Sequence, residues 1–82
     1  MIVTHSVSLS WTASTSTVSG YNVYRSLTSG SGYAKVNTGL VSSVNYTDAT
    51  VANTTTYYYV TTAVDANGNE SIDSSEAVAA IP

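Results

Sequence analysis

An acidic stretch near the C-terminus carries the oxygen ligands from which calcium loops are built. Residues 65–76 nearly fit the twelve-residue calcium-binding loop, with oxygen-bearing side chains at its first, third, fifth, ninth and twelfth positions. That loop requires glycine at its sixth position, where this chain has Glu70, and helices on both sides. The favoured interpretation is therefore a polar turn, with weak calcium binding between Asp65 and Glu76 as the alternative. No metal or cofactor site is predicted.

The other titratable residues do not form a catalytic pattern. His5 has no carboxylate near it in the sequence, so a serine–histidine–acid triad lacks support and His5 is expected to be solvated. Asp73 and Glu76 lack the apolar surroundings that would raise one pKa for glycoside hydrolysis. The chain has no cysteine, which excludes a thiol nucleophile and a disulfide framework. The sequence predicts a protein that is not an enzyme.

Tyrosine and asparagine side chains favour binding over catalysis. Tyr24, Tyr58 and Val60 fall on the outward face of two expected strands, where aromatic rings can stack on sugars or anchor a protein. Asn67 and Asn69 lie in an expected end loop, a common place for binding residues. These five residues are the predicted partner-binding positions. The alternative is a surface that carries tyrosine only because tyrosine suits strands.

Alternation with period two places these residues on strands. Apolar and polar residues alternate in six short runs, at residues 6–12, 20–25, 33–36, 44–48, 55–64 and 76–81, with turn-forming residues between them. Tyr57, Tyr59 and Thr61 are expected to face inward on the longest strand, and Val78 and Ala80 on the last. The pattern predicts an all-β antiparallel sandwich of two sheets, forming a single domain over residues 1–82.

Composition limits the partners. The 82 residues include 2 basic and 5 acidic residues, for a net charge of −3, so no nucleic-acid binding is expected. No run approaches the roughly 18 apolar residues of a membrane-spanning helix, so no membrane insertion is expected. Residues 1–5 lack the basic and apolar regions of a signal peptide.

Several segments, in this order and spacing, resemble a fibronectin type III domain of the kind found in bacterial secreted and surface proteins. They are residues 7–11 (VSLSW), 20–26 (GYNVYRS), 46–48 (YTD), 57–60 (YYYV), 63–65 (AVD) and 68–71 (GNES). By this resemblance, the sandwich is immunoglobulin-like and Trp11 is the core tryptophan of the family's second strand. Tyr57 is the tyrosine-corner residue, whose hydroxyl bonds to nearby backbone. Thr61 takes an inward position that the family usually fills with valine.

The resemblance also raises the question of oligomeric state. Only residues 1–6 precede the family's second strand, so its first strand is expected to be shortened. A shortened first strand leaves an edge less covered, so a monomer and an edge-paired or swapped dimer are both left open.

The resemblance implies a non-catalytic spacer module between neighbouring domains of a longer bacterial protein, such as a carbohydrate-active enzyme or an adhesin. Such a module would be extracellular, secreted or on the cell surface, with its termini at or near opposite ends. The alternative is a recognition module, natural or an engineered binding scaffold, for polysaccharide or protein. It would use the Tyr24 and Tyr58 face or the loops at residues 13–19 and 66–75.

Overall fold

The computed structural model describes residues 5–15, 17–74 and 76–82 and consists of strands and loops. Its strands are β1 (Val7–Ser10), β2 (Gly20–Ser26), β3 (Ala34–Lys35), β4 (Asn45–Asp48), β5 (Thr56–Val64) and β6 (Ala77–Ala80). Valine, threonine and tyrosine dominate them, because branched and aromatic side chains fit a pleated surface better than a helix. The all-β prediction is confirmed. Among these residues no helix is long and apolar enough to cross a membrane.

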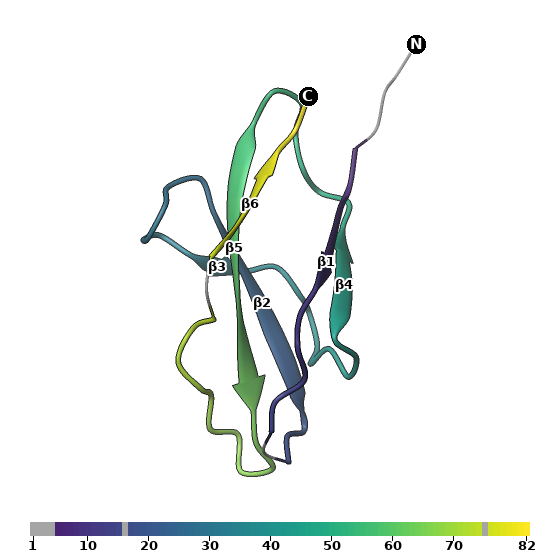
Figure 1. The fold of residues 1–82 in the computed structure, drawn as a ribbon, viewed down its shortest axis with the longest axis vertical. Helices are drawn as coiled ribbons and strands as arrows, with labels where there is room; N and C mark the ends of the chain where they lie inside the picture. The colour runs from purple at the N-terminus through teal and green to yellow at the C-terminus, as the bar shows by residue number, and fades with distance from the viewer. Residues whose placement is uncertain (1–4, 16, 75) are drawn as a thin grey trace.

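The strands form two antiparallel sheets (Figure 1). β1 pairs with β4, and the larger sheet has the order β3-β2-β5-β6. The β2–β5 ladder runs from Gly20 opposite Val64 to Ser26 opposite Tyr58. The predicted two-sheet sandwich is confirmed. The shortened first strand was expected within residues 1–6, of which residues 1–4 lie outside the described part of the chain.

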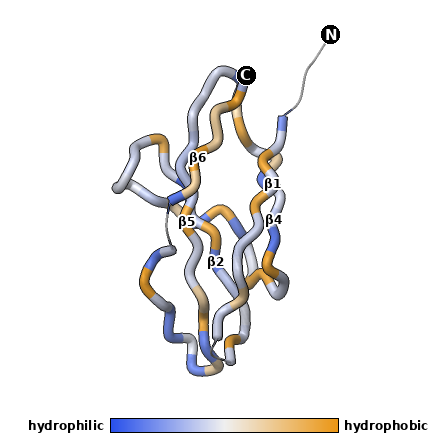
Figure 2. Tube along the Cα trace, viewed as in Figure 1, coloured by the Kyte–Doolittle hydropathy of each residue, from blue (hydrophilic) through white to orange (hydrophobic). Residues whose placement is uncertain are grey.

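The core lies between the two sheets. Its buried centre consists of Val23, Tyr57, Tyr59 and Ile81, and partly buried side chains from both sheets pack around it. Trp11 is one of these, and its ring meets Tyr21 edge to face, with 5.5 Å between ring centroids. The predicted core position of Trp11 is confirmed. Figure 2 shows the contrast between these strands, where hydrophobic positions recur, and the mostly hydrophilic segment that joins β5 to β6.

The tyrosine corner is also present. Tyr57 is 5% exposed, and the backbone N–H of Ala52 donates a hydrogen bond of 2.8 Å to its hydroxyl oxygen. This bond ties the turn before β5 to the core. Within that turn Thr54 has a φ of 52°, in the left-handed region that favours glycine.

The face assigned to β6 is corrected by the structure. Val78 and Ala80 were expected to face inward, but Tyr57 lies opposite Ala79 and Tyr58 opposite Val78. Ala79 therefore packs against the core, while Val78 is 62% exposed. A shift of one residue moves every side chain of a strand to the other face. The predicted inward face of β6 was wrong by that one residue.

The chain's termini were expected at or near opposite ends, and the N-terminal one lies outside the described residues. β1 begins and β6 ends at the same end of the sandwich (Figure 1). In Figure 1 the chain runs down β1, up β2, down β5 and up β6. The start of β1 and the end of β6 therefore lie at the same end of the sandwich. An opposite-end arrangement would need one more traverse than the described strands provide.

Candidate functional site

The outer face of the larger sheet carries the tyrosines that the sequence singles out. Tyr24 lies opposite Val60 in the β2–β5 ladder, with both side chains on the face away from the core. The predicted orientation is confirmed, but the face is not open. Four of its side chains are only 4–7% exposed, namely Asn22, Val60, Thr62 and Val64. The connection between β5 and β6, residues 65–76, reaches this face through Glu70.

Glu70 attaches this connection to the sheet. Its carboxylate accepts a hydrogen bond of 3.2 Å from the side-chain amide of Asn22, and further hydrogen bonds from the hydroxyls of Thr62 and Tyr24. The hydrogen bond from Thr62, followed by those from Tyr24 and Asn22, lowers the pKa of Glu70. The hydrogen bond to Glu70 in turn raises the pKa of Tyr24. An ionised carboxylate is thus held among neutral donors.

Glu76 holds the loop between β2 and β3 in the same way. It accepts hydrogen bonds from the hydroxyl of Ser29 at 2.7 Å, from the backbone N–H of Gly30 at 2.9 Å, and from the hydroxyl of Tyr33. The hydrogen bonds from Ser29, Tyr33 and Gly30 lower the pKa of Glu76, and the contact raises the pKa of Tyr33. The β5–β6 connection is therefore anchored by a tyrosine–glutamate contact at two places.

The five predicted partner-binding residues do not gather into one site. Tyr24 and Val60 are neighbours, but Val60 is 4% exposed and the hydroxyl of Tyr24 is bound to Glu70. Tyr58 is half-buried near the start of β5, whereas Asn67 and Asn69 follow its far end. Roughly 20 Å of strand separates them, at about 3.3 Å per residue. Partner binding by these residues stays a prediction.

The acidic groups of the β5–β6 connection point to separate partners. Asp65 accepts the backbone N–H groups of Asn69 and Asn67, each at 2.9 Å, and these bonds lower its pKa. The result is a polar turn, as the sequence favours. In the described ranges, no group of three or more histidine, cysteine or acidic residues is placed to hold a metal ion.

His5, the sole histidine, is half-buried immediately before β1. The one ion pair found among the described residues joins Arg25 to Asp48 and does not involve it. In the part of the chain that the structure describes, His5 therefore has no ion pair with an acidic residue of the kind that a catalytic triad uses.

Sequence reasoning missed a buried polar cluster between the sheets. Asp48, 2% exposed, accepts hydrogen bonds from Arg25 at 2.9 Å, Tyr59 at 2.8 Å and the hydroxyl of Thr50 at 2.6 Å. Arg25 also lies 4.8 Å from the centre of the Tyr57 ring. Burial by itself would raise the pKa of Asp48, but its donors outweigh burial and lower it. Burial, with the bond to Asp48, raises the pKa of Tyr59. The cluster joins β4 to β2 and β5, so its role is structural.

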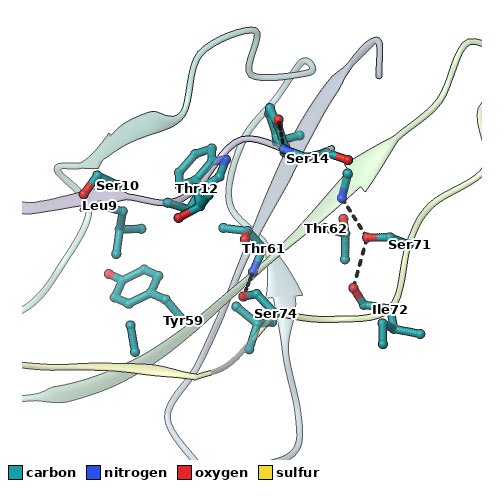
Figure 3. Close-up of a pocket in the computed structure, with 15 residues that line it drawn as sticks. Leu9, Ser10, Thr12, Ser14, Tyr59, Thr61, Thr62, Ser71, Ile72 and Ser74 are labelled. Carbon is teal, nitrogen blue, oxygen red and sulfur yellow. Dashed lines mark hydrogen bonds between the residues drawn. The ribbon is translucent and has the colours of Figure 1, made fainter. Parts of the chain in front are cut away.

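A groove of about 470 Å³ opens between the sheets beside β1 (Figure 3). Leu9 and Tyr59 point toward one another there, from β1 and β5 (Figure 3). Trp11 also lines it, and its indole Nε1 is buried without a hydrogen-bond partner among the described residues. The groove exists because a two-stranded sheet faces a four-stranded one and leaves part of β5 uncovered.

Comparison with known proteins identifies the family. A solved Fn3-like protein from Clostridium thermocellum is 43% identical with a TM-score of 0.83, and the match covers 94% of this chain and 77% of that one. The chain belongs to the fibronectin type III family. No family model matches it.

Curated relatives show the same type of segment inside larger enzymes. An amylopullulanase of Thermoanaerobacter thermohydrosulfuricus is 46% identical over 70 residues, which is 85% of this chain and 5% of that enzyme. Amylopullulanases of Thermoanaerobacterium thermosulfurigenes and Thermoanaerobacterium saccharolyticum are 42% and 41% identical over 89% of this chain, which spans 4% and 6% of their lengths. This fibronectin type III chain is thus homologous to a short segment of multidomain bacterial enzymes.

Proposed function

We propose that this chain is a non-catalytic structural module that spaces neighbouring domains of a longer bacterial protein, secreted or on the cell surface. The observation that carries the proposal is that its homologous segments form only 4–6% of large amylopullulanases. The contacts of Asp48, Glu70 and Glu76 support it, because these carboxylates hold strands and loops together. Its partners are then the flanking domains.

The positions of β1 and β6 support a particular form of the proposed spacer. Since β1 begins and β6 ends at one end of the sandwich, polypeptide that continues directly from these strands leaves from that end (Figure 1). The molecule measures 45 × 25 × 20 Å along its principal axes. The segments that enter β1 and leave β6 are therefore separated by about the width of the sandwich and not by its length.

A recognition role is the second candidate, and one observation favours it. Tyr58 and Val78 are cross-strand neighbours on the outer face, and Val78 is 62% exposed. An aromatic ring beside an exposed aliphatic side chain is a typical anchor for a sugar or a protein.

Retention on insoluble polysaccharide separates the two roles. The chain is passed over granular starch, insoluble α-glucan and bacterial cell walls, beside a Tyr58→Ala variant. A spacer is retained on none of them. Retention of the chain, with loss of binding in Tyr58→Ala and no change in its melting temperature, would replace the spacer role by recognition.

A further inference from the structure

A second groove, of about 510 Å³, opens between the end of β2, the loop that joins β2 to β3 and the turn before β5. It shares no lining residue with the groove beside β1. Among the described residues that line it, Arg25 is the one that carries a charge. The guanidinium lies 4.8 Å from the centre of the Tyr57 ring, and 26% of the Arg25 side chain is exposed. A ligand that enters this groove therefore meets a cation.

The guanidinium of Arg25 is only partly used by the fold. Its Nη1 donates hydrogen bonds to the carboxylate of Asp48 at 2.9 Å and to the hydroxyl of Thr50 at 2.8 Å. A guanidinium has five N–H donors, and those on Nε and Nη2 of Arg25 have no acceptor among the described residues. Two neighbouring guanidinium nitrogens form a fork that matches the two oxygens of a carboxylate. The unused side of Arg25 is thus suited to a second carboxylate.

Two hydroxyl groups add further donors at this groove. The hydroxyl oxygen of Tyr57 accepts the backbone N–H of Ala52, but its own proton has no acceptor in the described part of the chain. Thr28 is exposed and lines the groove, and its hydroxyl has no partner among the same residues. These donors suit a ligand group that only accepts hydrogen bonds, as an ionised carboxylate does.

The protein's own carboxylates oppose such a ligand only weakly. Asp48 is 2% exposed and already accepts hydrogen bonds from three residues, and Glu76 is bound by donors of the loop between β2 and β3. Neither carboxylate lines the groove. Charges farther away than about 8 Å are largely screened at physiological ionic strength, so the net charge of −3 does not prevent binding.

The remaining lining residues favour a polypeptide over a sugar acid. Leu27 lines the groove and is 68% exposed, so it can pack against an apolar side chain of a ligand. A sugar ring typically stacks on the open face of an aromatic side chain. The ring of Tyr57 is 5% exposed, and no other described lining residue is aromatic.

We infer that this groove binds an acidic side chain of a partner polypeptide. The carboxylate pairs with Nε and Nη2 of Arg25, and an apolar side chain next to it in the partner packs against Leu27. The inference is independent of the proposed spacer role, because it concerns a part of the surface that the spacer role does not use.

Two peptides and a sugar acid test the inference. Acetyl-Ala-Glu-Leu-Ala-amide carries a carboxylate beside leucine, and acetyl-Ala-Gln-Leu-Ala-amide replaces that carboxylate by an amide of the same shape. In an NMR titration we expect the first peptide to shift the Nε–H resonance of Arg25 and to bind about tenfold more tightly than the second. Equal binding of the two peptides, or no shift at Arg25, overturns the inference. Tighter binding of methyl glucuronide than of the first peptide would assign the groove to sugar acids and overturn it as well.

Two variants that add the same charge locate the site. Ala52 is exposed and lines the groove, whereas its neighbour Asn53 is exposed and does not line it. Ala52→Glu places a competing carboxylate at the groove, and Asn53→Glu adds one beside it. We expect Ala52→Glu to weaken binding of the first peptide about tenfold and Asn53→Glu to weaken it less than about twofold. Equal effects of the two folded variants contradict binding in this groove, and the peptide pair decides if either variant does not fold.

Discussion

Thr54 holds a backbone conformation that β-branched residues rarely adopt. Its φ of 52° brings its Cβ close to the following carbonyl, which costs on the order of 1–2 kcal/mol. Thr54→Gly removes that Cβ, but glycine loses more conformational entropy on folding. We therefore expect a net gain of about 1 kcal/mol in the free energy of unfolding, measured by urea denaturation. Thr55→Gly, where φ is not positive, is the control and should lower stability. A lower midpoint for Thr54→Gly would contradict the strain at this position.

The hydroxyl of Tyr57 accepts the backbone N–H of Ala52, so Tyr57→Phe removes one partner of a hydrogen bond. Ala52 is exposed, and water can replace the lost acceptor. We expect a loss of about 1 kcal/mol in the free energy of unfolding, at the low end of the range for such bonds. Urea midpoints measure it. Tyr58→Phe, at the adjacent residue on the outer face, is the control and should change the midpoint little. Equal midpoints for Tyr57→Phe and the parent chain would refute the corner.

Asp48→Ala leaves Arg25 without its carboxylate at the sheet interface. Breaking a buried pair in this way costs about 3–5 kcal/mol, and we expect the lower value because Arg25 keeps 26% of its side chain exposed. Replacing both residues, as Arg25→Met with Asp48→Leu, should restore part of the loss, since no charge is then left unpaired. Thermal denaturation of the single and double variants measures the difference. A double variant less stable than Asp48→Ala would show that the polar contacts themselves are indispensable.

At the scale of elements, we expect pH to change how strongly the β5–β6 connection is held to the rest of the molecule. A carboxylate whose pKa is lowered by folding adds stability above its ordinary pKa of about 4.3 and loses it as the pH falls through the folded value. Glu70 and Glu76 are of this kind. The raised pKa of Tyr24 works in the opposite sense, adding stability below about pH 10 that is lost as the pH rises. We expect the connection to be most firmly attached between about pH 5 and 9.

Amide exchange of Ser71 and Ser74, corrected for the intrinsic rate at each pH, measures this attachment. Protection should fall as the pH drops below about 4 and again as it rises above about 10. Glu70→Gln keeps the shape of the side chain but removes its charge. In this variant the amides of Ser71 and Ser74 should be less protected at neutral pH, and their protection should fall less when the pH is lowered. The part of the acid response that comes from protonation of Glu76 should remain. Equal protection at acid and neutral pH in the parent chain would show that the carboxylates do not hold the connection.

Strands were predictable from the sequence because alternation is a local property. β2 and β5 carry long patterns, and their faces follow from period two. β6 reads Ala-Val-Ala-Ala, four small or medium residues with little contrast, and its face is decided by Ile81, which packs in the core. An error of one residue there was invisible in the pattern.

Contacts between distant residues were harder to predict. The Glu70–Tyr24 bond joins residues 46 positions apart, so no local pattern reveals that the tyrosine face is covered. Arg25 did leave a signal. It is one of 2 basic residues. It follows Val23 by two positions in the same strand, so its side chain falls on the same face as that of Val23, which lies in the core. An inward-facing arginine needs a buried carboxylate, and Asp48 supplies it.

At the scale of the whole molecule, the entry into β1 and the exit from β6 lie at one end (Figure 1). The chain contains no cysteine, so spin labels can be placed at chosen pairs of sites. Ser6 and Ala80 are exposed next to the entry and exit, whereas Asn67 is exposed at the far end of β5. We expect pulsed EPR to give a shorter distance for Ser6→Cys with Ala80→Cys than for Asn67→Cys with Ala80→Cys. The reverse order would place the entry into β1 at the opposite end from the exit of β6. The expected order supports an entry into β1 and an exit from β6 at the same end of the sandwich.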